Sequence, residues 1–510
     1  MTRAPAGVSD VVSRALAEQP DATALVTRTR RLTYAQLDAE AATAANALLA
    51  LGIRPGDRVA ASLPNEADVV VAFHGALRIG AIWVGINRAL APAEKRYLLD
   101  DSGASFYLCD EQAAAQVAGP DQPRRLVLSG PGDEWEGAMA AATAEPCGIR
   151  PDPDAPAGIA YTSGTTGYPK GAVHSQRNLL LPGTVIIAAR GYGRDLRKGD
   201  CLPLTILNMM VLTTLLVAQA GGCCIIMDRI DAEGVAEWIR RERVTTFNGP
   251  PALFYSLAHH PGVAADDLAS LQDAWTGGAD CPEAIRDAFR ARFDRELAST
   301  YGLSEAPTVV TIDPMGGPHH AGASGVALPH LRVRIADKDG SDVPAGETGE
   351  VCVSATSDGE WAGRYRPMLG YWQRQEATEA ALRGGELRTG DLGFLDPEGY
   401  LAIRDRTSLV VIRGGANVYP AEVERVLFEH PAVAAAAVLG LPDERLGERV
   451  AGVVQLESGM EVTEDDLRQH CLTLLARYKV PERFIFVDEF ERNSMGKIVR
   501  RNLRDLFVTL

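Results

Sequence analysis

The stretch from Tyr161 to Gly171 reads YTSGTTGYPKG and carries the densest set of chemically useful residues in the chain. Its glycines allow a tight turn that brings backbone N–H groups close to an anion. Ser163, Thr165 and Thr166 add hydroxyl donors, and Lys170 adds a positive charge. These groups suit the binding of a polyphosphate. The stretch is not a Walker loop, because it contains no G-K-[ST] tripeptide.

Three charged residues further along the chain could also do chemistry, namely Glu305, Asp391 and Lys497. Taken singly, Glu305 would be a surface acid after a loop tyrosine, and Asp391 a turn residue after Thr-Gly. Lys497, near the end of the chain, would be a solvated side chain. Their significance therefore depends on the motifs that surround them.

These motifs, taken in order, resemble those of the acyl-adenylate-forming superfamily, which includes acyl-CoA synthetases, peptide-synthetase adenylation domains and firefly-type luciferases. The resemblance covers nearly the whole chain and joins several separate segments. Besides the loop at Tyr161–Gly171, the segments that resemble the family are Leu63–Glu66, Gly277–Ala279, Tyr301–Glu305, Gly349–Glu350, Gly370–Trp372, Arg388–Asp391, Arg406, Gly414–Pro420 and Asn493–Lys497.

The resemblance implies an acid–thiol ligase that forms an acyl-adenylate from ATP and uses Mg²⁺ and coenzyme A. It assigns catalysis to Lys497, Glu305 and Thr165, with Glu305 and Thr165 as metal ligands. Tyr301 would stack on adenine, and Asp391 and Arg406 would contact the ribose. The full set of implied ATP and AMP contacts is Thr162, Ser163, Gly164, Thr165, Thr166, Gly167, Lys170, Gly277, Gly278, Ala279, Thr300, Tyr301, Gly302, Ser304, Asp391 and Arg406.

Transfer to the thiol implies a second arrangement of the same enzyme. In the family, a small C-terminal domain rotates after adenylation and replaces the Lys497 face with the face of Gly414 and Gly415. Paired glycines leave room for a slim pantetheine arm. The hinge position is Ser408 here, where the family usually has Asp or Lys, and this difference bears on the rate of rotation rather than on its existence.

The acyl pocket implied by the resemblance consists of Ile206, Met209, Asn248, Gly249, Trp275 and Leu303. Ile206 takes the position of a common family histidine. The segment around it also lacks the aspartate that amino-acid-activating domains use, so an α-ammonium group would stay unpaired. We therefore expect an uncharged aliphatic, alicyclic or aryl acid. Whether the acceptor is coenzyme A or the phosphopantetheine thiol of a carrier protein stays open.

The elements that must position these residues follow an alternating pattern of helices and strands. Thr33 and Gln36 have capping-box spacing before a helix that stops at Gly52. A strand at 58–63, a helix at 66–79 and a strand at 81–84 come next. The pattern predicts an α/β fold in which helices cover mostly parallel sheets.

A compositional break at 399–406 separates the last hundred residues, where strands are expected at 434–439, 450–456 and 484–487. Two helices are expected there, one from Pro420 and one capped by Thr463. We therefore predict an adenylation domain over 1–405 and a mobile α+β domain over 406–510.

Composition narrows the remaining classes of function. The net charge of −16 over 510 residues argues against general binding to nucleic acid. The eight cysteines have no metal-ligand spacing, and neither a signal core nor a membrane span is evident. We expect a cytoplasmic enzyme whose partner is a small carboxylate, and a homodimer stays open. The chain lacks the motifs of a P-loop kinase and of a hydrolase. A non-catalytic adenylate binder is disfavoured, because the chain retains Glu305, Asp391 and Lys497.

Overall fold

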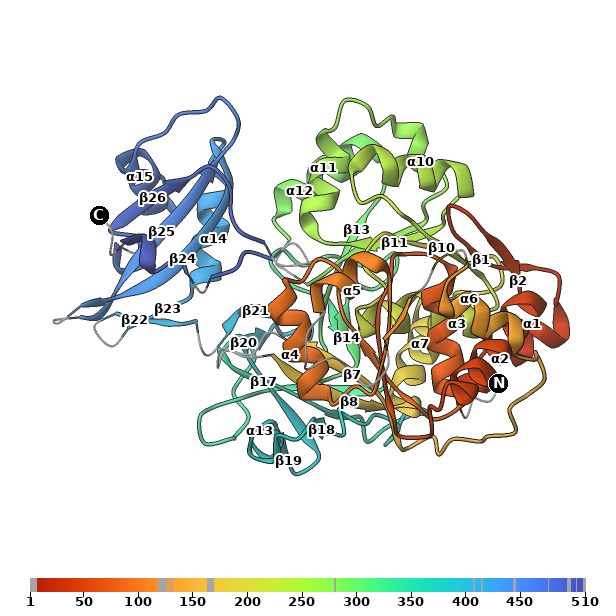
Figure 1. Cartoon of the computed structure of the whole chain (residues 1–510). Coiled ribbons are helices and arrows are strands. Elements are labelled where there is room, and N and C mark those ends of the chain that lie inside the picture. Colours follow the sequence, from red (N-terminus) through yellow and green to blue (C-terminus); the bar gives the residue numbers. More distant parts are fainter. Residues whose placement is uncertain are drawn as a thin grey trace.

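The structure is a computed structural model, shown in Figure 1, and its description covers almost the whole chain. The described residues are 7–117, 126–128, 130, 132–162, 169–278, 281–406, 409–413, 416–443, 446–475, 477–492, 497–500 and 502–507. A large N-terminal part holds three sheets, and a small C-terminal unit, blue in Figure 1, holds a fourth. The predicted α/β class is confirmed.

The largest sheet has nine strands, of which the six central ones are parallel. Their loops meet at one edge of the sheet, which is where parallel sheets place their ligand sites. In spatial order the strands are β15 (Val326–Ala327), β14 (Thr308–Ile312), β13 (Leu297–Leu303), β12 (Asp273–Thr276), β11 (Thr246–Gly249), β9 (Arg197–Asp200), β10 (Cys223–Ile226), β1 (Thr23–Val26) and β2 (Arg31–Thr33).

A seven-stranded sheet lies beside it and carries the end of the glycine-rich segment. Strands β7 and β8 pair antiparallel, and the loop between them contains residues 163–169. In spatial order the strands are β18 (Gly370–Tyr371), β8 (Lys170–Ser175), β7 (Pro156–Thr162), β4 (Ile82–Gly85), β3 (Arg58–Ser62), β5 (Phe106–Cys109) and β6 (Leu126–Leu128).

Helices form three layers around these two sheets. One layer lies between the sheets, since its buried residues share a single core with both of them. It contains α1 (Ser13–Glu18), α2 (Tyr34–Ala50), α3 (Ala67–Arg78), α6 (Glu134–Ala141), α7 (Gln176–Arg190), α8 (Leu207–Met209), a π-helix (Met210–Leu215) and α9 (Leu216–Ala220). The outer face of the nine-stranded sheet packs on α10 (Ala232–Glu242), α11 (Pro251–His259) and α12 (Glu283–Phe293). The outer face of the seven-stranded sheet packs on α4 (Pro92–Ser102) and α5 (Glu111–Val117).

A third, antiparallel sheet follows the two large ones in sequence. It contains β16 (Leu331–Ala336), β17 (Gly349–Ala355), β19 (Leu382–Arg383), β20 (Glu386–Leu395) and β21 (Leu401–Arg406), with α13 (Gln375–Ala381) before β19. The expected break at 399–406 is therefore mostly a strand. Strand β21 pairs with β20 along its length, as far as Arg406.

The C-terminal unit has its own sheet and two cores, one on each face. Its strands are β22 (Val411–Arg413), β23 (Ala416–Val418), β24 (Val433–Asp443), β25 (Gly447–Leu456) and β26 (Arg483–Val487), and its helices are α14 (Pro420–Phe428) and α15 (Glu464–Leu474). The expected strands and both helix starts are confirmed. Thr463 forms a capping box with Asp466, as Thr33 does with Gln36.

Among the helices of the described residues, none combines the length and hydropathy that a bilayer crossing needs.

Candidate functional site

The C-terminal ends of β12 and β13 bring the predicted nucleotide residues together. Thr300 Oγ1 donates a hydrogen bond to the carbonyl oxygen of Thr276, at 3.0 Å, and so ties the two strand ends to each other. A Cβ on Gly277 would lie 2.2 Å from Thr300 Oγ1, so any side chain there would have to displace Thr300. Gly302 is equally restricted, because its Cβ would lie 1.9 Å from the backbone oxygen of Thr308.

Lys497 reaches this strand edge from the C-terminal unit. A Cβ built on Gly278 would lie 3.9 Å from Lys497 Cε, which places the lysine side chain directly beside the Gly277–Gly278 turn. The sequence could not predict which pose the C-terminal unit adopts. In this structure, the unit presents Lys497 to the predicted nucleotide residues.

Two further contacts join the C-terminal unit to the helices outside the nine-stranded sheet. Tyr255 of α11 donates a hydrogen bond from its hydroxyl to Glu457 Oε1, at 3.0 Å. Phe428, the last residue of α14, packs against the core formed by α10, α11 and α12. We call these three residues the docking contact. It holds the unit beside the large part while Lys497 lies at Gly278.

Tyr301 and Asp391 form the second group of the site. The Tyr301 hydroxyl donates to Asp391 Oδ2 at 2.6 Å, and Asp391 is only 4% exposed. Asp391 on β20 pairs with Arg406 on β21, so the backbone places the two predicted ribose contacts opposite one another. The side chain of Arg406 lies outside the described part of the structure.

Glu305 lies in a third group, built around Tyr371, for which the sequence analysis predicted no role. The Tyr371 hydroxyl donates to Glu305 Oε1 at 2.8 Å, and Thr162 Oγ1 donates to the same oxygen at 3.4 Å. Lys170 Nζ lies 5.3 Å from the centre of the Tyr371 ring. Carboxylate and hydroxyl oxygens next to the glycine-rich segment are the donor set that Mg²⁺ prefers, so these residues fit the predicted metal.

A buried histidine supports the residue before Glu305. His174 Nε2 lies 2.7 Å from the carbonyl oxygen of Ser304, which can only accept, so Nε2 carries the proton. Burial lowers the pKa of His174 to about 4, so the ring is neutral at pH 7. Asn208 Nδ2 also donates to Ser304 Oγ, at 3.4 Å. His174 follows the K-G-A-V segment that begins at Lys170. This closeness to the glycine-rich loop is the only feature of the sequence that could have pointed to His174.

Most of the predicted acyl-pocket residues lie on the inner face of the nine-stranded sheet. Gly249 differs, because a Cβ there would face Leu253 and Phe254 of the outer core. Met209, Trp275 and Leu303 are buried in one core, and Ile206 packs against it half-buried. Asn248 lies opposite Trp275 in the β11–β12 register, and Gly249 is the next residue of β11.

A buried acid lies just before the segment 202–210, which itself lacks an aspartate. Asp200 is fully buried, and its carboxylate lies 3.8 Å from the ammonium of Lys198, which is also fully buried. Lys198 donates to Asn248 Oδ1, and Thr213 donates to Asp200 Oδ2 at 2.6 Å. Burial lowers the pKa of Lys198 and raises that of Asp200. The sequence alone does not predict this buried pair, because Lys198-Gly199-Asp200 has the composition of an exposed turn.

Several predicted residues lie outside the described residues, and their roles stay predictions. They are Ser163, Gly164, Thr165, Thr166, Gly167, Ala279, Ser408, Gly414 and Gly415.

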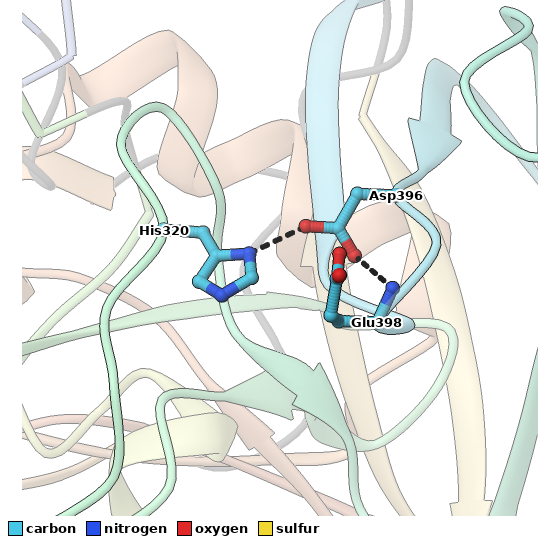
Figure 2. Close-up of side chains that lie close together, drawn as sticks. All are labelled: His320, Asp396 and Glu398. Carbon is cyan, nitrogen blue, oxygen red and sulfur yellow. Dashed lines mark hydrogen bonds and ion pairs between the residues drawn. The ribbon is translucent and has the colours of Figure 1, made fainter.

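Figure 2 shows the group of side chains in the described residues whose ligand atoms lie close enough to share a metal ion, namely His320, Asp396 and Glu398. His320 Nδ1 and Asp396 Oδ2 are 2.6 Å apart, and Asp396 Oδ1 accepts the backbone N–H of Glu398 at 3.0 Å. The His320 ring also stacks on the Tyr400 ring, with 3.8 Å between the two ring centres. These contacts anchor a loop to the β20–β21 turn, and the group does not include Glu305.

Comparison with known proteins identifies the family. The family model described as AMP-binding enzyme matches residues 12–372, and the AMP-binding enzyme C-terminal domain matches residues 422–497. The chain belongs to the AMP-binding enzyme family. This membership confirms the acyl-adenylate-forming superfamily and supports an AMP-forming acid–CoA ligase.

The proteins similar to this chain are named for different acid substrates. A feruloyl-CoA synthase from Amycolatopsis sp. is 36% identical over 500 residues, which cover 96% of each chain. A fatty acid–[acyl-carrier-protein] ligase, ScoC, from Streptomyces coeruleorubidus is 33% identical over 501 residues, covering 96% of this chain and 94% of ScoC. The crystal structure of the anthranilate CoA ligase AuaEII with anthranoyl-AMP has a TM-score of 0.91 at 26% identity, covering 100% of this chain and 99% of that one.

Proposed function

We propose that this enzyme activates an uncharged aliphatic, alicyclic or aryl carboxylate with ATP and passes the acyl group to the thiol of coenzyme A. The position of Lys497 supports this proposal most directly. Its side chain lies beside Gly278, on the same strand edge as Thr300 and Tyr301. Both reactants of adenylation are anions, so a cation delivered there lowers the main electrostatic barrier.

In the first step, a carboxylate oxygen attacks the α-phosphorus of ATP. The bond between that phosphorus and the bridging oxygen to the β-phosphate breaks, and pyrophosphate leaves with the electron pair. Lys497 would contact the attacking carboxylate and the α-phosphate, where negative charge is greatest. Tyr301 would stack on adenine, and Asp391, oriented by the Tyr301 hydroxyl, would accept from the ribose.

Glu305 and Thr165 would hold Mg²⁺, which neutralises phosphate charge when it is bound. The hydrogen bond from Tyr371 fixes one oxygen of the Glu305 carboxylate and thereby its orientation. Lys170, beside the Tyr371 ring, would add positive charge at the phosphates.

In the second step, the thiol sulfur attacks the acyl carbon, AMP leaves with the electron pair of the broken C–O bond, and the thiol loses its proton. Lys497 must withdraw to make room for the thiol arm. We assign the movement to a domain that comprises residues 406–510, with Ser408 at the hinge and with Gly414 and Gly415 lining the thiol path. Residues 1–405 would form the adenylation domain.

Loading of a carrier protein is a second candidate function. The similarity to ScoC, whose name gives an acyl carrier protein as acceptor, supports it. The pantetheine thiol is the same chemical group in coenzyme A and in a carrier protein, so the two functions differ only in the surface that the acceptor meets.

A panel assay separates these functions. Pyrophosphate release would be measured with ATP and Mg²⁺ over aliphatic, alicyclic, aryl and amino acids, with and without coenzyme A, and with a phosphopantetheinylated carrier protein. Hydroxylamine would trap acyl-adenylate that finds no acceptor. Release with an uncharged acid and formation of its acyl-CoA would support the proposal.

Acyl transfer to the carrier protein alone would favour the second function. Release with amino acids only would contradict the proposed substrate class. No release and no hydroxamate with any acid would contradict both functions.

A further inference from the structure

The strand that leads into the reacting centre limits how far an acid can extend. Trp275 lies on β12, and Gly277 directly follows Thr276, the last residue of that strand. If the alternation of the strand is carried one residue further, Gly277 faces the same side of the sheet as Trp275. At a rise of roughly 3.3 Å per residue they are about 6.6 Å apart along the strand. An acid whose carboxylate lies between Gly278 and Lys497, and whose tail runs along this face, therefore meets the indole within about one ring length.

Beyond the indole, the interior is charged rather than apolar. Lys198 Nζ lies 5.4 Å from the centre of the Trp275 ring, and Asp200 lies 3.8 Å from the same ammonium. Both are fully buried, and Asn248 accepts from Lys198. An alkyl chain that pushed past Trp275 would displace one partner of this pair and leave a buried charge without compensation.

The indole itself has an unused polar group. Trp275 is 2% exposed, and its Nε1–H meets no hydrogen-bond acceptor among the described residues. A buried donor without an acceptor is costly, and a substrate oxygen at this depth would satisfy it. The pocket floor would thus favour a polar atom at the end of the acid remote from the carboxylate.

We propose that Trp275 is the specificity-determining residue of the acyl pocket and that the substrate is a single-ring aryl acid with an oxygen substituent remote from its carboxylate. Trp275 limits the length of the acid and donates a hydrogen bond to its oxygen. This inference rests on the proposed acid activation. Two of the three proteins described above are named for ferulate and for a fatty acid, so the choice between an aryl acid and a long chain depends on this chain's own residues.

The test compares kcat/KM for pyrophosphate release with benzoate, 4-hydroxybenzoate, hexanoate, dodecanoate and hexadecanoate. The enzymes are the unaltered protein, Trp275→Phe, Trp275→Ala and Trp83→Phe. Phenylalanine keeps the ring but removes the N–H donor, whereas alanine removes the floor. Trp83 on β4 is a matched control, because it is also fully buried with an Nε1 that has no partner in the described structure, but it lies in the other sheet.

We expect the unaltered enzyme to prefer 4-hydroxybenzoate over benzoate by about tenfold, the value of one neutral hydrogen bond. Trp275→Phe should abolish this preference and keep the length limit. Trp275→Ala should raise the ratio of dodecanoate to benzoate by about tenfold or more. Trp83→Phe should change neither ratio.

Equal use of hexadecanoate and the aryl acids by the unaltered enzyme would overturn the inference, and so would an unchanged hydroxyl preference in Trp275→Phe. Either result would leave the acid activation intact. Absence of pyrophosphate release with every acid would instead contradict the proposed function. The KM for ATP, measured in each variant, shows whether the nucleotide site has survived, and Trp275→Phe keeps the test decisive if Trp275→Ala fails to fold.

Discussion

At the scale of single residues, hydroxyl groups orient the charged side chains of the site. Tyr371 and Thr162 bond to Glu305, and Tyr301 bonds to Asp391. Each bond fixes a carboxylate without neutralising it, so the charge stays available for a metal or a ribose. Lys497 differs from them, because it reaches the site on a separate unit.

Replacement of Lys497 by alanine should therefore separate the two half-reactions. We expect acyl-adenylate formation to fall by about a hundredfold to a thousandfold, as when a preorganised charge is removed from a transition state. Thioester formation from supplied acyl-adenylate should change little, because the proposed movement withdraws the lysine before that step. Rapid-quench measurement of each half-reaction checks this. Lys479→Ala, which removes a lysine paired with Glu422 in the same unit, is the control, and equal loss of both steps in Lys497→Ala would contradict the assigned role.

Replacement of Tyr371 by phenylalanine tests the orientation of Glu305. The ring beside Lys170 stays, but the hydroxyl that donates to Oε1 is lost. We expect the Mg²⁺ concentration for half-maximal pyrophosphate release to rise by about tenfold, the value of one hydrogen bond to a charged group. Tyr161→Phe, which removes a similar bond to Asp101, should leave this concentration unchanged. An unaltered Mg²⁺ dependence in Tyr371→Phe would show that Glu305 needs no such support.

At the scale of elements, the site depends on how closely β12 and β13 approach each other. Gly277 faces Thr300 with no room for a side chain, and the Thr300 hydroxyl bridges to Thr276. Gly302 approaches β14 equally closely. Close strand packing is thus by itself a reason for the glycines in these motifs.

A pair of substitutions tests this packing. Gly277→Ala should push β12 away from β13 and lower kcat/KM for ATP by about tenfold or more. Thr300→Ala removes the oxygen that the new methyl group would meet, so the double variant should recover part of the loss. The coupling free energy from the double-mutant cycle is the measurement, with about 1 kcal/mol or more expected. Strict additivity would contradict the contact as the cause.

The sequence predicted the helices and strands better than it predicted the contacts between them. The capping boxes at Thr33 and Thr463 predicted two helix starts correctly, and the apolar run from Arg58 became β3. The order of the motifs likewise pointed to Glu305, Asp391 and Lys497. The bond from Tyr371 to Glu305 and the Lys198–Asp200 pair escaped prediction. The first joins residues 66 positions apart, and the second is visible only once β9 is known to be buried.

At the scale of the whole molecule, three buried histidines link folding to pH. Burial lowers the pKa of His74 to about 3, and those of His174 and His330 to about 4, from 6.5. In the unfolded chain these rings take up protons as the pH falls below 6.5, whereas the folded protein excludes them until the pH nears the lowered pKa. The free energy of unfolding should therefore decrease as the pH falls from 6.5 towards 4.

Each histidine should contribute a slope of about 1.4 kcal/mol per pH unit within this window. Urea midpoints at pH 7.0 and 5.0 measure the difference, and His330→Gln should reduce it. The substitution leaves the predicted nucleotide residues unchanged. If His330→Gln retained the full pH dependence, then His330 would not be the neutral, buried group that the structure describes.

The docking contact of Tyr255, Glu457 and Phe428 has a consequence for timing. The docking contact, with one hydrogen bond to a carboxylate and one half-buried ring, adds only a few kcal/mol to the stability of the closed arrangement. We expect so weak a contact to reopen often and to uncover the freshly made mixed anhydride. We expect water and small amines to compete with the thiol during those openings. The share of the acyl group that reaches the thiol would then depend on how quickly the acceptor arrives. A high concentration of the acceptor thiol would suppress hydrolysis of the intermediate.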